Sequence, residues 1–190
     1  MPNTPNLQTP KHYRVLKSEK RFVGRVFSLV VDQIEYPDGS RADREVAAHP
    51  GGAVILPIFD DGRILLIRQY RHPSGQWLLE LPAGKLEHKE APLSCAQREL
   101  EEETGFTAAT WEPLISIHTS PGFCSEVLHI FVARRLSPVA GGQRLESGEA
   151  TLTLHPMTWN DALAMIEHGE IVDSKTICGI LLAHRLQMHA

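Results

Sequence analysis

The order of hydrophobic and polar positions along the chain predicts strands and helices that alternate. An apolar run at residues 52–59 is followed by a turn sequence and a second apolar run at residues 63–68, which predicts a β-hairpin. Residues 26–36 are rich in β-branched side chains and precede a turn and residues 44–46, which predicts an earlier hairpin. Further strands are predicted at residues 77–81, 111–118, 127–133 and 151–155.

Three segments have the composition and the end signals of helices. Residues 91–103 form the first, and Gly105 follows as a residue that tolerates the left-handed conformation ending a helix. Thr158 and Asp161 match a capping box at the start of the second, and residues 174–187 carry apolar positions at helical spacing. Because strands and helices interleave, we expect an α/β domain of packed layers.

Composition and charge exclude several classes of protein. The 190 residues are 42% hydrophobic and 22% charged, as in folded proteins rather than disordered ones. No apolar run approaches the roughly 20 residues that cross a bilayer, and the polar N-terminus lacks the apolar core of a secretion signal. A net charge of −4 argues against nucleic acid as a partner. The three cysteines lack a metal-binding spacing, which favours a reducing, cytoplasmic location.

The predicted helix at residues 91–103 concentrates carboxylates on one face. At 100° per residue, Glu99, Glu102 and Glu103 lie within an arc of about 100°, beside an apolar stripe that can pack on a sheet. Like charges at this spacing repel, and a divalent cation would relieve the repulsion. Carboxylate oxygens suit Mg²⁺ and Mn²⁺, which also offset the charge of substrate phosphates. The alternative is an acidic face that contacts only solvent.

The residues around this helix resemble the Nudix box, the signature G-x5-E-x7-R-E-U-x-E-E-x-G-U in which U is bulky and apolar. Gly84 and Glu90 occupy its first two positions, and residues 98–106, which read RELEEETGF, supply the others. Every specified position matches. The resemblance implies a Nudix-type α/β/α sandwich with a mixed sheet, and metal-dependent hydrolysis of a nucleoside diphosphate linked to another moiety.

Carried over position by position, the resemblance assigns roles to the box residues. Four groups are expected to hold Mg²⁺, for which Mn²⁺ can substitute: the carboxylates of Glu99 and Glu103, that of Glu102 directly or through water, and the carbonyl of Ala83. Glu90 and Arg98 are expected to pair and, with Gly84, to hold the box in shape.

Features outside the box resemble the ADP-ribose pyrophosphatase branch of the family. They are residues 68–71, which read RQYR, residues 77–84, which read WLLELPAG, and residues 120–123, which read SPGF. The branch implies hydrolysis of ADP-ribose to AMP and ribose 5-phosphate. Another nucleoside diphosphate sugar, such as GDP-mannose or UDP-glucose, is the second expectation.

Two functions of other classes are alternatives. One is a non-catalytic sensor of ADP-ribose or NAD derivatives, which the complete set of box carboxylates disfavours. The other is a hydrolase that removes damaged nucleoside triphosphates, which usually lacks the Pro121 element and an N-terminal β-domain.

The branch also implies functional residues beyond the box. Its catalytic base is a glutamate on a late loop, for which Glu149 is the first candidate and Glu146 the second, in addition to Glu102 of the box. Guanidinium groups match the geometry of a phosphate, so the expected substrate contacts include three arginines, Arg44, Arg68 and Arg71. Pro121 and Gly122 of the SPGF element are the other expected substrate contacts. Packing in the core is the first expectation for Tyr70 and Phe123, and stacking on a base the second.

The resemblance implies a division of the chain into two parts. Residues 1–48 comprise an N-terminal tail and a small β-domain, and residues 49–190 the hydrolase domain. Because the branch exchanges the β-domain between subunits, we expect a homodimer.

Overall fold

The computed structural model describes residues 13–145, 150–186 and 188, which form two compact units. One unit comprises the described residues up to His49 together with Ser120–Ser125. The other comprises Pro50–Thr119 and the described residues from Glu126 onward. Each unit has its own β-sheet.

The first unit is an antiparallel three-stranded sheet of β1 (Arg14–Val23), β2 (Ser28–Glu35) and β3 (Arg41–Ala48). The hairpin of β2 and β3 confirms the sequence prediction, whereas β1 was not predicted because charged residues occupy its centre. No described residue of these strands is fully buried. Large apolar side chains are instead more than half exposed in this unit: Val15, Phe22, Val23 and Val26.

The second unit is built on a mixed seven-stranded sheet with the order β10-β5-β4-β9-β8. The short strands β6 and β7 pair with β5 and β4, and β4 runs parallel to β9. The bounds are β4 (Gly52–Ile58), β5 (Ile64–Arg71), β6 (Gln76–Glu80), β7 (Ala83–Lys85), β8 (Phe106–His118), β9 (Val127–Pro138) and β10 (Thr153–Met157). Because β4 and β5 pair only at Ile58 and Ile64, they diverge, and β6 and β7 occupy the space between them.

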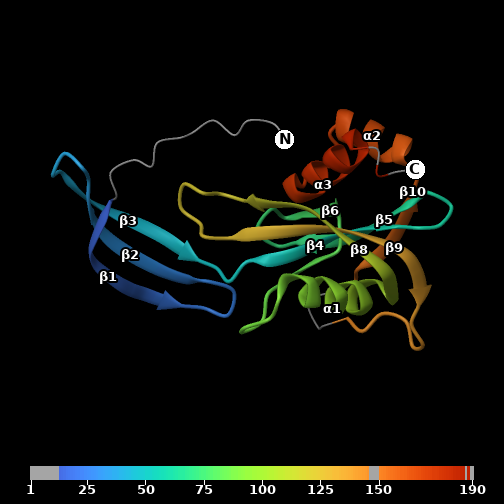
Figure 1. Cartoon of the computed structure of the whole chain (residues 1–190), viewed down its shortest axis with the longest axis horizontal. Coiled ribbons are helices and arrows are strands. Elements are labelled where there is room, and N and C mark those ends of the chain that lie inside the picture. Colours follow the sequence, from blue (N-terminus) through green and yellow to red (C-terminus); the bar gives the residue numbers. More distant parts are fainter. Residues whose placement is uncertain (1–12, 146–149, 187, 189–190) are drawn as a thin grey trace. The chain divides into compact units, whose positions relative to one another are not determined.

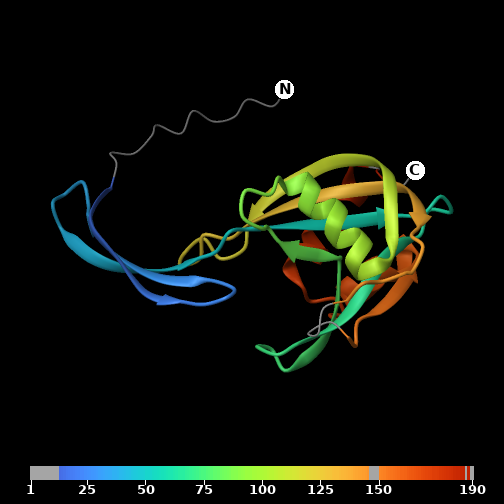
Figure 2. The same cartoon turned by 90° about the horizontal axis from the view of Figure 1, so that it is seen from below.

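Helices cover both faces of this sheet (Figures 1 and 2). The helix α1 (Pro92–Thr104) packs on one face through Cys95, Ala96 and Leu100. The helices α2 (Trp159–Glu167) and α3 (Ser174–Arg185) cover the other face. No helix among the described residues is long and apolar enough to cross a bilayer. The predicted α/β/α sandwich with a mixed sheet and an extra N-terminal sheet is confirmed.

Two details differ from the elements that the sequence predicts. Residues 82–84 were expected to end a strand, but Ala83–Lys85 form β7, because Ala83 and Gly84 find partners at Val54 and Ala53 of β4. Strands β8 and β9 are also longer than predicted. Their added residues pair with each other, from Phe106 opposite Pro138 onward, and this long-range ladder has no periodic apolar signal in either segment.

Candidate active site

Local sequence explains where α1 begins and ends. Its N-cap, Ala91, contributes no side-chain hydrogen bond, and Pro92 at the first turn has no N–H that needs a partner. Gly105 ends the helix with φ 71°, a left-handed conformation, and its N–H donates to the carbonyl of Glu101 at 2.9 Å. The face of α1 that packs on the sheet adjoins the face that carries the carboxylates. The packing of α1 therefore also fixes the direction in which the acidic face points.

Two of the three box carboxylates are buried against the sheet. Glu103 is 1% exposed and Glu99 is 8% exposed, whereas Glu102 is half-buried. The N–H of Ala83 donates to Oε2 of Glu103 at 2.9 Å. Glu103 therefore links α1 to β7, and the acidic face is turned toward the segment of residues 83–85.

Arg98 connects three carboxylates of the box: those of Glu90, Glu99 and Glu102. Its Nε and Nη2 donate to the two oxygens of Glu90, both at 3.0 Å, and its Nη1 donates to Glu99 at 2.6 Å and to Glu102 at 3.0 Å. Hydrogen bonding from Arg98 lowers the pKa of Glu90 and, together with the charges of the acidic residues, raises the pKa of Arg98 itself. The single positive charge of the guanidinium thus offsets part of the negative charge of the acidic face.

Gly84 allows the carboxylate of Glu99 to approach the backbone closely. A Cβ atom added at residue 84 would lie 1.8 Å from the carboxyl carbon and from Oε1 of Glu99. No side chain larger than hydrogen fits there while Glu99 keeps its position. The box glycine therefore provides the room in which a box carboxylate lies.

The donor chemistry of this cluster fits a hard divalent cation. Among the residues that the structure describes, no group of three or more His, Cys, Asp or Glu side chains is arranged so that it could hold a metal ion. The carboxylates of Glu99 and Glu102 instead share the guanidinium of Arg98. Oxygen ligands of this type are those that Mg²⁺ and Mn²⁺ prefer, and a cation would replace part of the charge balance that Arg98 provides.

Cys95 lies next to the carboxylates but has the wrong chemistry for such a cation. Its side chain is fully buried, and burial, together with the charges of Glu90 and Glu99, raises the pKa of the thiol to about 12. The thiol lies 3.6 Å from the carbonyl oxygens of Gly84 and Lys85. Cys95 is thus a protonated, buried thiol, whereas metal coordination requires a thiolate.

A second charged cluster lies where β5, β6 and the start of α3 meet. Glu80 is 1% exposed and accepts hydrogen bonds from Nε of Arg71 at 2.8 Å, from Nη2 of Arg71 at 2.7 Å and from Nζ of Lys175. Burial alone would raise the pKa of Glu80, but Arg71 and Lys175 outweigh this effect and lower it. The sequence prediction gave Glu80 no role beyond its place in residues 77–84 and gave Lys175 none, although a lysine in the first turn of a helix is an unusual feature.

Replacing Glu80 by Gln is expected to make stability less dependent on pH. The folded-state pKa of Glu80 is below its ordinary value of 4.5, so its ion pairs stabilise the fold above that pH and lose their effect as the pH falls through the folded-state pKa. At neutral pH the substitution should lower the free energy of unfolding by about 3 kcal/mol, because it leaves Lys175 without its buried anion. Urea denaturation at a series of pH values below neutral measures this difference, and a difference that does not shrink as the pH falls contradicts the assignment.

The structure brings only some of the predicted substrate residues toward the box. Arg71 lies close enough to Glu103 for that carboxylate to contribute, after Glu80, to raising the pKa of Arg71. Arg68 belongs to the opposite face of β5, since side chains alternate along a strand, and its guanidinium lies 5.2 Å from the ring centroid of Trp77. The expectation that Tyr70 packs in the core is wrong: it is 45% exposed, with its ring 5.7 Å from that of Trp77 at the protein surface.

Other predicted residues belong to the first unit or lie outside the described residues. Arg44 stacks on Tyr36 within the first sheet, with its guanidinium carbon 5.5 Å from the ring centroid. Pro121 and Gly122 are exposed in the turn that belongs to this unit. Phe123 is 61% exposed, so its predicted place in the core is also wrong. The two candidate bases, Glu146 and Glu149, lie outside the described residues.

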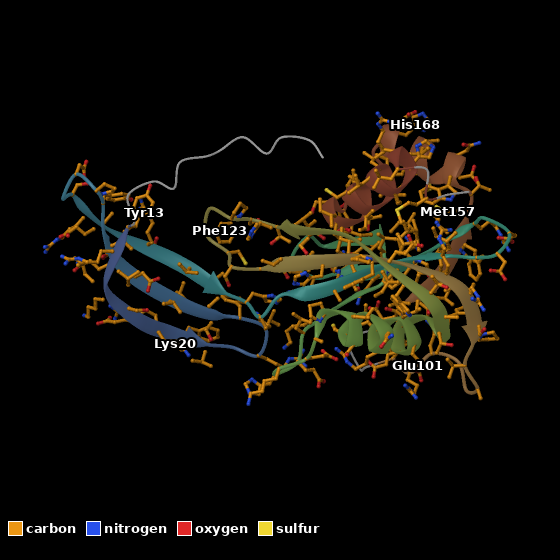
Figure 3. The ribbon with its side chains drawn as sticks, viewed as in Figure 1. Tyr13, Lys20, Glu101, Phe123, Met157 and His168 are labelled. Carbon is orange, nitrogen blue, oxygen red and sulfur yellow. The ribbon has the colours of Figure 1, made fainter. Side chains whose placement is uncertain are left out.

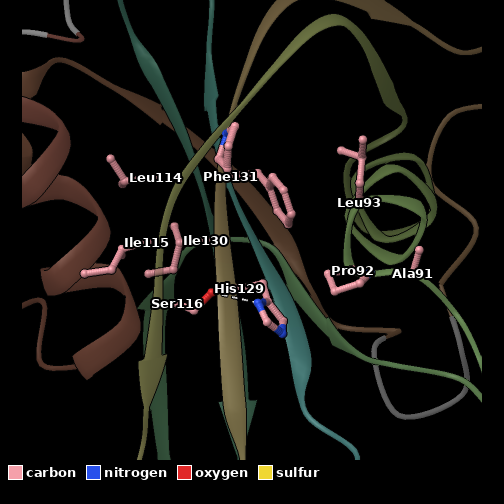
Figure 4. Close-up of a pocket in the computed structure, with 10 residues that line it drawn as sticks. Ala91, Pro92, Leu93, Leu114, Ile115, Ser116, His129, Ile130 and Phe131 are labelled. Carbon is pink, nitrogen blue, oxygen red and sulfur yellow. Dashed lines mark hydrogen bonds between the residues drawn. The ribbon is translucent and has the colours of Figure 1, made fainter.

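A cavity of about 400 Å³ lies beside the first turn of α1 and strands β8 and β9 (Figure 4). Its lining is mostly apolar, and its polar feature is the contact between Oγ of Ser116 and Nδ1 of His129, 2.8 Å apart. The described residues that line it include no lysine, arginine or carboxylate, and none of the predicted site residues. Its lining, as far as the structure describes it, offers no lysine or arginine to a diphosphate and no carboxylate to a cation, so the acidic face of α1 remains the candidate site.

The sandwich, the carboxylate-bearing helix and the glycine before it together define the class of this protein as a Nudix-type pyrophosphohydrolase. The model of the NUDIX domain matches residues 48–173, most of the chain, and the protein therefore belongs to the NUDIX domain family. The prediction from the box is confirmed.

Relatives of known activity match over most of the chain. The ADP-ribose pyrophosphatase of Bacillus subtilis (strain 168) is 38% identical over 167 residues, 88% of this chain and 90% of the relative. The methanol dehydrogenase activator of Bacillus methanolicus is 41% identical over the same shares of the two chains. The GDP-mannose pyrophosphatase of Cronobacter sakazakii (strain ATCC BAA-894) is 33% identical over 82% of this chain and 87% of the relative.

Solved structures show the same fold. A crystal structure of an ADP compounds hydrolase superposes with a TM-score of 0.79, covering 94% of this chain and 96% of that chain, at 23% sequence identity. At this level of identity the similarity concerns the fold alone.

Proposed function

We propose that the protein hydrolyses the diphosphate of ADP-ribose to AMP and ribose 5-phosphate with a divalent cation. Water adds to one phosphorus atom, and the bond from that phosphorus to the bridging oxygen breaks. The observation that carries the proposal is the pair of buried carboxylates, Glu99 and Glu103, held against Gly84 and Ala83 in a member of this family. The relative named ADP-ribose pyrophosphatase supports the choice of substrate.

The acidic face would hold the cation, which we propose to be Mg²⁺ with Mn²⁺ as a substitute. The proposed ligands are the carboxylates of Glu99, Glu103 and Glu102 and the carbonyl of Ala83. A cation bound there supplies a Lewis acid for a phosphoryl oxygen and lowers the pKa of bound water. Glu90 and Arg98 keep the proposed positioning role, since their ion pair ties α1 to the segment that precedes it.

Arg71 is the substrate contact that the geometry of the second unit supports best. Its side chain is 40% exposed, it is bound on one side by Glu80, and it lies within electrostatic range of Glu103. A guanidinium in this position can donate to a phosphate oxygen. Substrate contacts by Arg44, Arg68, Pro121 and Gly122, and proton removal by Glu149 or Glu146, stay predictions.

The alternative substrate is another nucleoside diphosphate sugar, which the relatives named GDP-mannose pyrophosphatase favour less because their identity is lower. The two substrates share the diphosphate and differ in base and sugar, so the same acidic face serves both. The test is product analysis after incubation of the purified protein with Mg²⁺ and ADP-ribose, GDP-mannose, UDP-glucose, NADH or a nucleoside triphosphate. AMP formed fastest from ADP-ribose supports the proposal. Faster turnover of another compound replaces the substrate, and binding of ADP-ribose without any product contradicts an enzymatic role.

We also propose a homodimer in the cytoplasm. Within the first unit, Val15, Phe22 and Val23 are each more than half exposed on strand β1, and a three-stranded sheet without buried residues gains stability when another chain covers it. Light scattering coupled to size exclusion should give twice the mass of 21.2 kDa that one chain has. A replacement of Phe22 and Val23 by Asp should shift this mass toward that of one chain. A monomeric wild-type protein contradicts the proposal.

A further inference from the structure

Lys175 occupies a position that local physics disfavours. It lies in the first turn of α3, where the positive end of the helix dipole repels a cation, and only 10% of its side chain is exposed. Burial adds a desolvation cost for the ammonium group. Proteins break local rules of this kind at functional or strained sites.

The interaction of Lys175 with Glu80 joins segments that are 95 positions apart in the chain. Nζ of Lys175 donates to Oε2 of Glu80 and, at 3.0 Å, to Oδ2 of Asp173, the N-cap of α3. Oε2 of Glu80 also accepts from Arg71, so a single carboxylate oxygen is shared by the lysine and the arginine.

The neighbouring Thr176 fixes the same end of α3 to the segment that leads into the box. Its hydroxyl accepts a hydrogen bond from the N–H of Leu81 at 2.8 Å, and the threonine is fully buried. Two residues after Leu81, the N–H of Ala83 binds Glu103. The start of α3, the site of Arg71 and the acidic face of α1 are therefore connected by hydrogen bonds through one short stretch of backbone.

We propose that Lys175 is a positioning residue that prepares Arg71 to bind the substrate diphosphate. It holds the carboxylate of Glu80, and this carboxylate holds the guanidinium of Arg71 through both Nε and Nη2. Because Lys175 and Arg71 share Oε2 of Glu80, the carboxylate is not directed at Arg71 alone, and the guanidinium is better able to attract a phosphate. The inference rests on the proposed function, because it takes Arg71 as a contact of the diphosphate.

Replacing Lys175 by Met tests the inference, because Met keeps the length of the side chain and removes its charge. With the compound that the wild-type protein hydrolyses fastest, KM should rise about tenfold, since a charged hydrogen bond to the diphosphate is weakened, while kcat stays within about twofold. The Mg²⁺ concentration for half-maximal activity should not change. A purely structural role would reduce the folded fraction, which lowers the apparent kcat without raising KM.

Two comparisons separate positioning from other effects. In a protein that carries Arg71→Met, adding Lys175→Met should raise KM no further, because the lysine acts through the arginine. Arg185→Met removes a cation from the exposed last turn of the same helix and should leave KM and kcat at their wild-type values. If Lys175→Met does not fold, Lys175→Gln, which can still donate one hydrogen bond to Glu80, replaces it in both comparisons.

Each outcome bears on the inference. An unchanged KM, a fall of kcat at constant KM, or an equal rise of KM in the Arg71→Met protein overturns it. Failure of the proposed function is visible separately, as a wild-type protein that hydrolyses none of the tested compounds. Calorimetric binding of ADP-ribose then replaces KM, and Lys175→Met must weaken this binding about tenfold for the inference to stand.

Discussion

Replacement of Glu103 by Gln is expected to lower kcat about 1,000-fold at saturating Mg²⁺, equivalent to about 4 kcal/mol of transition-state stabilisation. Glu103 is the most deeply buried of the proposed carboxylate ligands. The amide of Gln lacks the negative charge with which the carboxylate would bind the cation. The amide oxygen of Gln can still accept the hydrogen bond from the N–H of Ala83, so the link from α1 to β7 is kept. The melting temperature should therefore stay within about 4 °C of the wild-type value. Steady-state kinetics and thermal denaturation measure the two quantities.

Glu101 offers a matched control on the same helix. Its carboxylate pairs with Arg144 at 2.7 Å, on the side of α1 that faces away from the sheet (Figure 3). Glu101→Gln removes one negative charge from α1, as Glu103→Gln does, and should leave kcat within about twofold of wild type because the lost surface ion pair is weak. Wild-type turnover by Glu103→Gln, or an equal loss in both variants, would show that the proposed ligand set is wrong.

Replacement of Gly84 by Ala is expected to lower kcat/KM about 100-fold with little loss of stability. The new Cβ would lie 1.8 Å from the carboxylate of Glu99, so this carboxylate must leave its place against the backbone. The clash involves the end of a flexible side chain, and Gly84 does not have a positive φ, so the fold can accommodate the change. Displacement of a group that orients or binds a metal costs about 10- to 100-fold in affinity or activity. Calorimetric titration with Mn²⁺ and steady-state kinetics measure the effect.

A double substitution distinguishes this steric effect from other consequences of the new methyl group. In a protein that carries Glu99→Ala, the clashing carboxylate is absent, and adding Gly84→Ala should reduce activity no further. If the second substitution still lowers the residual activity about 100-fold, the approach of Glu99 to Gly84 is not the cause.

The acidic helix was predictable from the sequence because its chemistry depends on local geometry. The helical repeat places Glu99, Glu102 and Glu103 on one face whatever surrounds the helix, and Gly105 ends the helix where the sequence predicts. The first turn of α2 is a similar case, since the hydroxyl of Thr158 accepts the hydrogen bond from the N–H of Asp161 that a capping box requires. The alternating order of elements was sufficient for the layered fold class.

Interactions between distant segments were beyond the reach of local patterns. The strand β7 exists because β4 and β5 diverge and leave a place for it, and the central charged residues of β1 give no strand signal of their own. Tyr70 is an aromatic residue of the kind that packs in protein cores, yet its position on β5 places it at the surface beside Trp77. The sequence marks such residues as apolar or aromatic, and only the arrangement of the sheet decides which of them are covered.

The sequence by itself determined the family and the acidic face of α1, because both follow from spacing within a short segment, and it determined the layered fold through the order of the elements. Only the tertiary structure decided how that face is used. In the folded chain Glu99 lies against Gly84, and Arg98 forms hydrogen bonds with the carboxylates. Lys175 contacts Glu80, which is 95 positions away in the sequence. These contacts depend on how α1 and α3 pack on a twisted sheet, where burial strengthens charge interactions and no periodic pattern records the partner.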